Sequence, residues 1–281
     1  MKNLTEKSLL VNLVICQWSA RKHDKSVTKE VNENHGSKDA GRFNKILVDK
    51  KHLEPLQKIA TRAREFHYEN TLPWGDNGDR LLPTDNYFEY TARVARFKNE
   101  WETEVNNFER NYPAMIDEAR INLNGLFNEK DYPRHITDRF DIKASFMPVP
   151  DAEDIRVNLS QGEVETLRRN VGEELQNRLA EATKEIFGRM HDVLAKMYAR
   201  LSEKDAIFKD SLFENVKDLV GLLPRLNITG DPAISELCKD MEQLYIDPQR
   251  VRNSKKLREE KAEEVDQILK KMDAFFSPVT A

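Results

Sequence analysis

The chain of 281 residues is poor in the residues that cross-link or sharply bend a backbone, with two cysteines, ten glycines and eleven prolines. Cys16 and Cys238 are distant in the sequence, and neither lies in a CxxC motif or a Cys/His cluster. The sequence therefore supports neither a disulfide framework nor a structural zinc site, and it suits a reducing cytoplasm. Scarce glycine, together with 33% charged residues, favours long solvated helices and argues against an all-β fold.

The chain also lacks a hydrophobic run of the roughly 18 residues that a membrane-spanning helix needs. The apolar run Leu9–Cys16 is interrupted by Asn12 and is not followed by a small-residue cleavage site, so it does not resemble a signal peptide. P-loop, GxGxxG, GxSxG and HExxH patterns are absent, which removes the common phosphate, hydrolase and zinc signatures. We therefore expect a non-enzymatic protein with no catalytic residues, no cofactor, no metal and no membrane partner.

Positive charge is concentrated in the first quarter of the chain. Residues 1–70 carry 14 Lys and Arg against 9 Asp and Glu, residues 71–150 carry 10 against 14, and residues 151–281 carry 21 against 26. Cations near Trp18 and Phe43 are candidates for a single-stranded DNA groove that acts by charge and stacking. These candidates are Arg21, Lys22, Lys25, Arg42 and Lys45. Nearby acids such as Asp24 and Asp39 dilute the positive field, so DNA binding is the alternative interpretation.

The longest periodic stretch of the chain predicts one long helix. Apolar residues from Val164 to Leu201 recur ten times over 37 residues, and Ser160 with Glu163 forms a capping-box pattern in front of them. A helix over Ser160–Ser202 would be about 65 Å long, which is too long for a compact globule of this size to bury by itself. The period of 3.7 residues favours a helical bundle over a two-stranded coiled coil.

A second amphipathic helix carries an aromatic face. Its apolar residues begin at Tyr87 and end at Tyr112, recurring at the helical period, so burial in a core explains them better than a stacking platform does. Pro113 is expected to break or kink this helix, with a separate helical piece over Ala114–Phe127. Further helices are predicted over Leu53–Tyr68, Ile207–Leu223, Ala233–Tyr245 and around Val265–Phe275.

Two segments have the pattern of strands. Leu9–Trp18 is apolar at nearly every position, which indicates a strand buried on both faces. Ile142–Val149 alternates and contains Pro148, which indicates an edge strand that pairs with the first. The polar segment Arg21–Lys51 is expected to form short helices and loops. The predicted fold is mainly α (α+β), a long-helix bundle with a small two- or three-stranded sheet, in which residues 1–150 form a mixed α/β base and residues 151–281 the bundle.

The segment Thr71–Asp85 is rich in proline and glycine and is predicted to be a loop. Its candidate recognition residues are Trp74, Asp76, Asp79 and Arg80. Long ordered loops are often functional, but the aspartates also suit turns and a helix cap, with Trp74 plugging the loop onto the helix below. The aspartate spacing misses the calcium-loop pattern, so we expect no metal there.

The resemblance to known proteins lies in four runs of the sequence, Gln17–Lys22, Asp39–Lys45, Leu72–Pro83 and Phe146–Pro150. These runs resemble a family of uncharacterised proteins from tailed bacteriophages. The resemblance covers most of the chain to about residue 200. It implies a phage protein made in the host cytoplasm, sometimes encoded near a MoxR-type AAA+ ATPase, which suggests that ATPase as a phage or host protein partner. It assigns no catalytic residue.

These observations favour a phage-encoded interaction or assembly protein that self-associates through its long helices into a homo-oligomer, a role that also suits an adaptor. The alternative is a single-stranded DNA binding or annealing protein that uses the five cations of the first quarter. An enzyme is the third hypothesis, with Asp76 and Asp79 in its only candidate loop.

Overall fold

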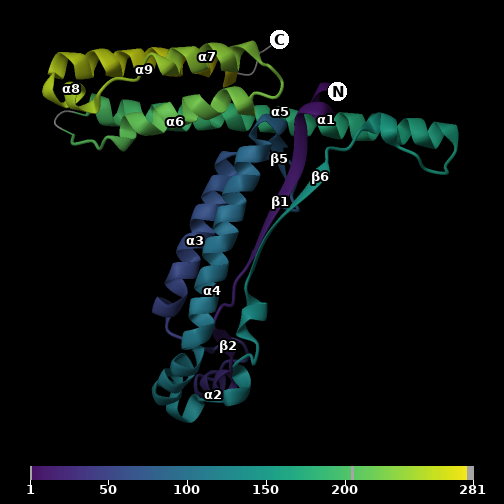
Figure 1. Cartoon of the computed structure of the whole chain (residues 1–281), viewed down its shortest axis with the longest axis vertical. Helices are drawn as coiled ribbons and strands as arrows, with labels where there is room; N and C mark the ends of the chain where they lie inside the picture. Colours follow the sequence, from purple (N-terminus) through teal and green to yellow (C-terminus); the bar gives the residue numbers. More distant parts are fainter. Residues whose placement is uncertain (1, 204–205, 277–281) are drawn as a thin grey trace. The chain divides into compact units, whose positions relative to one another are not determined.

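The structure is a computed structural model that describes residues 2–203 and 206–276, with side chains described for residues 4–203 and 206–273 (Figure 1). The described chain is mainly α, with a four-stranded antiparallel sheet and a two-stranded sheet. The predicted fold class is therefore confirmed, although the larger sheet has more strands than the two or three that the sequence indicates.

The chain divides into two compact units, and neither is continuous in the sequence. Unit 1 comprises Met1–Asn12, Tyr68–Phe88 and Phe146–Ala281, and unit 2 comprises Leu13–His67 and Glu89–Ser145. This division differs from the predicted boundary near residue 150, because strands β1 (Ser8–Cys16) and β6 (Asp141–Pro148) each contribute to both units.

The four-stranded sheet has the order β4-β5-β1-β6, so β6 lies at an edge beside β1, as the sequence predicts. Strands β4 (Leu72–Pro73) and β5 (Arg80–Pro83) were not predicted, because strands of two and four residues are too short to show a clear alternation. They turn part of the expected loop Thr71–Asp85 into an antiparallel hairpin. Only the first half of β1 is buried on both faces, since Val14 is 46% exposed.

Unit 1 is built around the predicted long helix. Helix α5 (Gln161–Ser202) begins at the predicted capping box, in which the Ser160 backbone N–H donates to Glu163 Oε2 at 3.0 Å and the Glu163 N–H donates to Ser160 Oγ at 3.4 Å. The remaining helices of the unit are α1 (Lys2–Lys7), α6 (Ser211–Leu226), α7 (Pro232–Glu242), α8 (Pro248–Asn253) and α9 (Lys255–Phe276). Met190 and Leu194 of α5 are fully buried among the side chains of this bundle.

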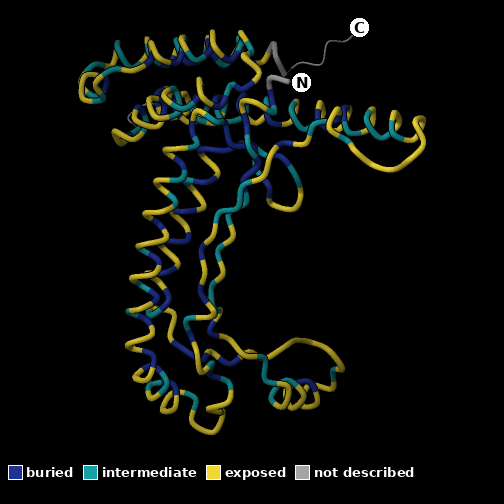
Figure 2. Tube along the Cα trace, turned by 45° about the vertical axis from the view of Figure 1, so that its right-hand side comes forward, coloured by how far each residue is buried: buried dark blue, intermediate teal, exposed yellow. Residues whose placement is uncertain are grey.

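Unit 2 contains an α-hairpin and a small ribbon. Helices α3 (Lys50–Glu69) and α4 (Tyr87–Leu123) lie side by side, and Figure 2 shows buried positions recurring along both. The aromatic face of α4 is buried at Phe97, Trp101 and Phe108, which confirms its interpretation as core. The ribbon consists of β2 (Arg21–His23) and β3 (Asn44–Ile46), joined through α2 (Lys25–Asn34).

Helix α4 continues through Pro113, so the predicted break and the separate helical piece over Ala114–Phe127 are wrong. Pro113 lies inside the helix and is exposed, so its ring faces solvent while Tyr112 and Met115 continue the buried face on either side. A proline costs about 3 kcal/mol inside a helix, which the burial of the residues that follow it offsets. The prediction for Arg21–Lys51 missed β2 and β3, because a polar three-residue strand has no apolar alternation to reveal it.

Candidate functional site

The β2–β3 ribbon brings most of the predicted DNA-binding cations together. Lys22 lies opposite Lys45 in the antiparallel register, and Arg21 lies opposite Ile46. The ribbon leads directly into α2, whose N-cap is Asp24: its Oδ1 accepts from the Ser26 N–H at 3.0 Å and the Val27 N–H at 3.2 Å. The Asp24 backbone N–H also donates to the Phe43 carbonyl at 3.0 Å, which holds the neighbours of Lys25 and Arg42 together.

Lys45 differs from the other four cations because it is buried. Its Nζ lies 2.6 Å from Asp131 Oδ2 and 3.2 Å from Asp24 Oδ2, and it donates to the Leu126 carbonyl at 3.1 Å. The hydrogen bond with Asp131 raises the pKa of Lys45. The structure therefore gives Lys45 an internal ion-pair role, and it leaves no free charge there for a DNA phosphate.

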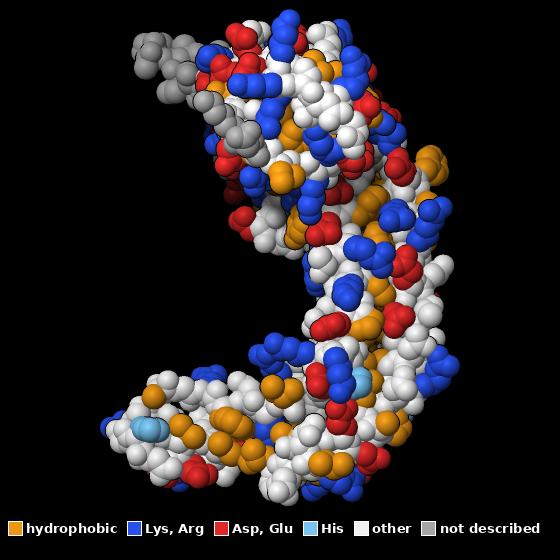
Figure 3. All heavy atoms as spheres, turned by 90° about the vertical axis from the view of Figure 1, so that its left-hand side faces the viewer, with side chains coloured by type: hydrophobic (Ala, Val, Ile, Leu, Met, Phe, Trp, Pro, Cys, Tyr) orange, Lys and Arg blue, Asp and Glu red, His pale blue; other side chains and the backbone are white. Residues whose placement is uncertain are grey.

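The remaining four cations form an exposed set that we call the cationic strip. It consists of Arg21, Lys22, Lys25 and Arg42. None of the four forms an ion pair with an acid in the described part of the chain, whereas the neighbouring Lys29 lies 3.6 Å from Glu33. Exposed Glu30 and Asp39 reduce the positive excess of this segment without removing it. The lower part of Figure 3, where α2 and β2 lie, shows basic and acidic side chains interspersed with hydrophobic ones.

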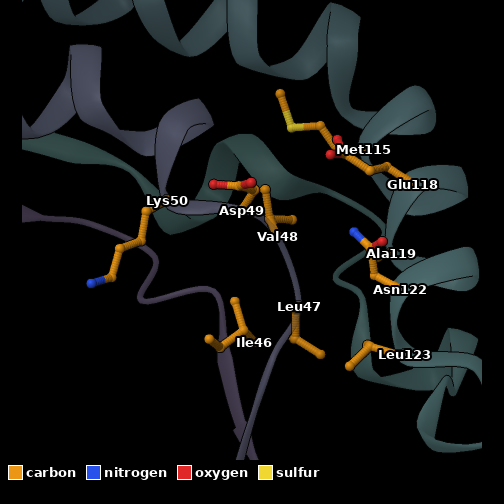
Figure 4. A pocket seen from close by; sticks show the side chains of 10 residues that line it. All are labelled: Ile46, Leu47, Val48, Asp49, Lys50, Met115, Glu118, Ala119, Asn122 and Leu123. Carbon is orange, nitrogen blue, oxygen red and sulfur yellow. The ribbon is translucent and has the colours of Figure 1, made fainter.

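A pocket of about 400 Å³ adjoins this ribbon. One side comes from the chain between β3 and α3, and the other from the last turns of α4 (Figure 4). Its apolar lining residues are Ile46, Leu47, Val48, Met115, Ala119 and Leu123, and its polar ones are Asp49, Lys50, Glu118 and Asn122. Ile46 is 53% exposed and lies opposite Arg21 in the ribbon, so the pocket meets the cationic strip at Arg21.

The acids of this pocket are already engaged. Lys51 Nζ lies 2.7 Å from Glu118 Oε1, and His52 Nε2 lies 3.1 Å from Glu118 Oε2. The hydrogen bond from Lys51 lowers the pKa of Glu118, and the backbone N–H of Lys51 lowers the pKa of Asp49. Both carboxylates are therefore charged and partnered at neutral pH. The pocket offers an apolar contact surface with fixed charges at its rim, not a carboxyl group poised for proton transfer.

The predicted recognition loop lies in unit 1, and its residues have different surroundings. Trp74 is buried in the core of that unit, as the plug interpretation predicts. Asp79 is buried and accepts hydrogen bonds from Asn12 Nδ2 at 3.0 Å and Asn77 Nδ2 at 2.8 Å. Arg80 Nε donates to Thr71 Oγ1 at 2.7 Å, which ties β5 to the start of the loop. Asp76 is the exposed member of the four.

The pocket residues were not identified from the sequence. Ile46 lies in a strand too short to show alternation, and Met115 and Ala119 follow the proline at which the helix was expected to break. One available signal was the helical spacing of Met115, Ala119 and Leu123, which continues the apolar face of α4 beyond Pro113.

Two further features bear on the chemistry of the chain. Across residues 2–203 and 206–276, no group of three or more His, Cys, Asp or Glu side chains is placed to hold a metal ion. No helix in the same ranges is long and apolar enough to cross a bilayer. Comparisons with protein-family models, with curated proteins and with solved structures found no match.

Proposed function

We propose that this chain is a non-enzymatic interaction protein that acts in assembly, as an adaptor, and that it binds an acidic, partly apolar segment of a protein partner at the end of unit 2. The observation that carries this proposal is that an apolar pocket meets the cationic strip at Arg21. Ile46 joins the two, because it lines the pocket and lies opposite Arg21.

The pocket and the cationic strip make different contributions to the free energy and rate of binding. Burial of the half-exposed Ile46 and of the pocket wall removes apolar area from water, and the free energy gained is roughly proportional to that area. The cationic strip contributes long-range attraction and orientation, which act mainly on the association rate and on the choice of partner. A segment that combines apolar side chains with Asp or Glu complements both parts.

The test is a titration of the protein with a labelled acidic peptide, the Leu/Glu peptide, in which Leu recurs every three or four residues and Glu occupies positions between. Ile46→Ser should remove apolar contact, and the double substitution Arg21→Glu/Arg42→Glu should reverse half of the strip. Each should weaken binding by about tenfold or more, equivalent to about 1.4 kcal/mol. The matched control is Lys58→Glu/Arg64→Glu, which makes the same charge change on exposed positions of α3. Equal affinity of all four proteins would refute the proposal.

Single-stranded DNA is the second candidate for the same surface. Phe43 is 38% exposed and directly follows Arg42, so an aromatic ring for base stacking adjoins the cations. A labelled oligothymidine should then bind with an affinity that falls steeply as salt rises. In that case the Arg21→Glu/Arg42→Glu protein loses DNA binding, whereas Ile46→Ser retains it, which separates DNA binding from peptide binding.

The wider setting of this proposal comes from the sequence resemblance. A phage protein made in the host cytoplasm would meet both phage and host proteins, and a MoxR-type AAA+ ATPase is one such partner suggested by the resemblance. Homo-oligomerisation that involves the long helices, α5 among them, belongs to the same proposal.

A further inference from the structure

We infer that the protein partner of the unit 2 surface is a second copy of this chain, whose unit 1 receives the cationic strip in an acidic cavity beside α5. This inference rests on the proposed function, since it names the partner of the same surface. It makes the contact heterologous, because two different patches of the same sequence meet.

The cavity lies between the β4–β5 hairpin loop and the first half of α5, and its volume is about 640 Å³. Its apolar lining residues are Leu10, Trp74, Pro150, Val171 and Leu175. Arg178 fixes the loop to the helix, because its guanidinium donates to the Trp74 carbonyl and its Nε lies 2.7 Å from Glu174 Oε1. The loop turns at Gly78, where φ is +88°, a conformation that favours glycine.

The charged groups of the cavity are predominantly acidic. Three carboxylates, those of Asp76, Asp79 and Glu174, line it together with the single guanidinium of Arg178. Arg178 is engaged by Glu174 and by the loop carbonyl. Neither Asp76 nor Asp79 forms an ion pair with a lysine or arginine among the residues that the structure describes. The cavity therefore carries an excess of negative charge.

The buried carboxylate of Asp79 makes a cation the favoured ligand of this cavity. Its side chain is buried, and its two oxygens accept from the amides of Asn12 and Asn77, which are neutral donors. A carboxylate removed from water is stabilised more by a cation than by neutral amides, because the Coulomb attraction is strong where water is excluded. The apolar wall of the cavity suits the aliphatic stem of an incoming lysine or arginine, whose charged end can then approach the carboxylates.

The same chain carries the complementary surface. The cationic strip holds four positive side chains that form no ion pair within the described residues, with Phe43 and Ile46 exposed beside it. Each surface thus combines an excess of one charge with apolar area, and the two excesses are of opposite sign. A foreign partner would have to reproduce a pattern that a second copy already offers. Because a heterologous contact leaves one patch open at each end, it extends into a ring or an open chain of protomers.

The experiment is sedimentation velocity of the full chain over a wide concentration range, at low and at moderate salt. The strip variant is Arg21→Glu/Arg42→Glu, and the cavity variant is Asp76→Arg/Glu174→Gln. We expect the wild type to form oligomers that grow with concentration and dissociate as salt rises, because salt screens exposed charges. Each variant alone should self-associate at least about tenfold more weakly, whereas Lys58→Glu/Arg64→Glu should match the wild type.

A mixture of the two variants gives the decisive test of the heterologous contact. The strip variant retains an intact cavity and the cavity variant retains an intact strip, so an equimolar mixture should form a complex that neither variant forms alone. A circular dichroism spectrum equal to that of the wild type and a cooperative thermal transition show that each variant is folded. A mixture that stays monomeric would overturn the inference, and so would variants that oligomerise as the wild type does, because self-association would then use another surface.

The failure of this inference can be told from the failure of the proposed function. A wild-type chain that is monomeric at every concentration but still binds the Leu/Glu peptide through Ile46 overturns the second-copy partner and leaves the docking surface in place. A chain that neither self-associates nor binds the peptide overturns the second-copy partner and the docking surface together. If the second-copy partner and the docking surface are both correct, the peptide should compete with self-association and shift the oligomers towards monomer.

Discussion

The two units treat buried charge in opposite ways. In unit 2 the buried cation Lys45 is neutralised inside the chain by Asp24 and Asp131. In unit 1 the buried carboxylate of Asp79 has two amides as hydrogen-bond partners and pairs with no lysine or arginine of the described residues. A closed ion-pair network stabilises its own unit, whereas a carboxylate without a counter-cation beside a cavity is suited to receive a cation from another molecule.

The largest expected effect comes from opening the closed network. Lys45→Met removes the cation and leaves the carboxylates of Asp24 and Asp131, which are 16% and 11% exposed, without their partner. We expect a loss of about 3 kcal/mol in the free energy of unfolding, measured by urea denaturation and localised by hydrogen exchange of the β3 amides. The control Lys51→Met breaks ion pairs of a half-exposed lysine and should cost a small fraction of this. Equal losses would show that the burial of Lys45 has no energetic consequence.

A smaller effect is expected at the open site. Asp79→Ala leaves the amides of Asn12 and Asn77 without their carboxylate acceptor, which should cost about 1–2 kcal/mol in unfolding free energy. Asp76→Ala is the matched control, because Asp76 is exposed and should be neutral. Thermal unfolding of the three proteins measures the difference. A loss at Asp79 as large as that at Lys45 would abolish the contrast between the units.

The capping box of α5 provides a reference for an exposed polar interaction. Ser160→Ala removes the side-chain acceptor of the Glu163 N–H, and caps of this kind contribute about 1 kcal/mol. The expected result is a small decrease in melting temperature with no change in the binding of the Leu/Glu peptide, which is measured in parallel. A change in peptide affinity would show that the two units are coupled energetically.

The pH dependence of unit 2 should be the mildest of these effects. The pKa of Asp24 is lowered, first by the hydrogen bond from the Val27 N–H, and that of Glu118 by the hydrogen bond from Lys51. A carboxyl group with a lowered pKa in the folded state stabilises the fold above its unfolded pKa of about 4 and loses that contribution as the pH falls below it. The raised pKa of Lys45 acts at the other end, where stability falls as the pH rises above about 10. Urea midpoints across the pH range should therefore fall at both extremes, and Lys45→Met should flatten the alkaline fall.

The spacing of apolar residues predicted the elements that are long enough to show a regular period. The helix from Ser160, the aromatic face of α4 and the pairing of the first strand with the edge strand at Pro148 were all available from spacing and turn chemistry. The strands β2 and β3 were not, because three residues do not define an alternation. The continuation of α4 through Pro113 was missed because local propensity opposes it and only the burial of the next turns favours it.

The candidate sites were predictable to a lesser extent. The sequence placed Arg21, Lys22, Lys25 and Arg42 in one basic segment, and all four are exposed. It could not separate Lys45 from them, since one of the two acids that neutralise it, Asp131, is 86 positions away along the chain. In the same way it indicated Trp74 as a plug but contained no sign that Arg178 would hold the loop against α5.

The amino-acid sequence by itself determined which faces of the long helices are apolar, where the capping box starts α5, and that charge of opposite sign predominates in different parts of the chain. Those properties depend on neighbours within a few turns, so spacing alone carries them. Only the tertiary structure decided which charges are neutralised internally and which face solvent or a cavity. That outcome depends on residues brought together from distant positions, where burial and Coulomb attraction act through space.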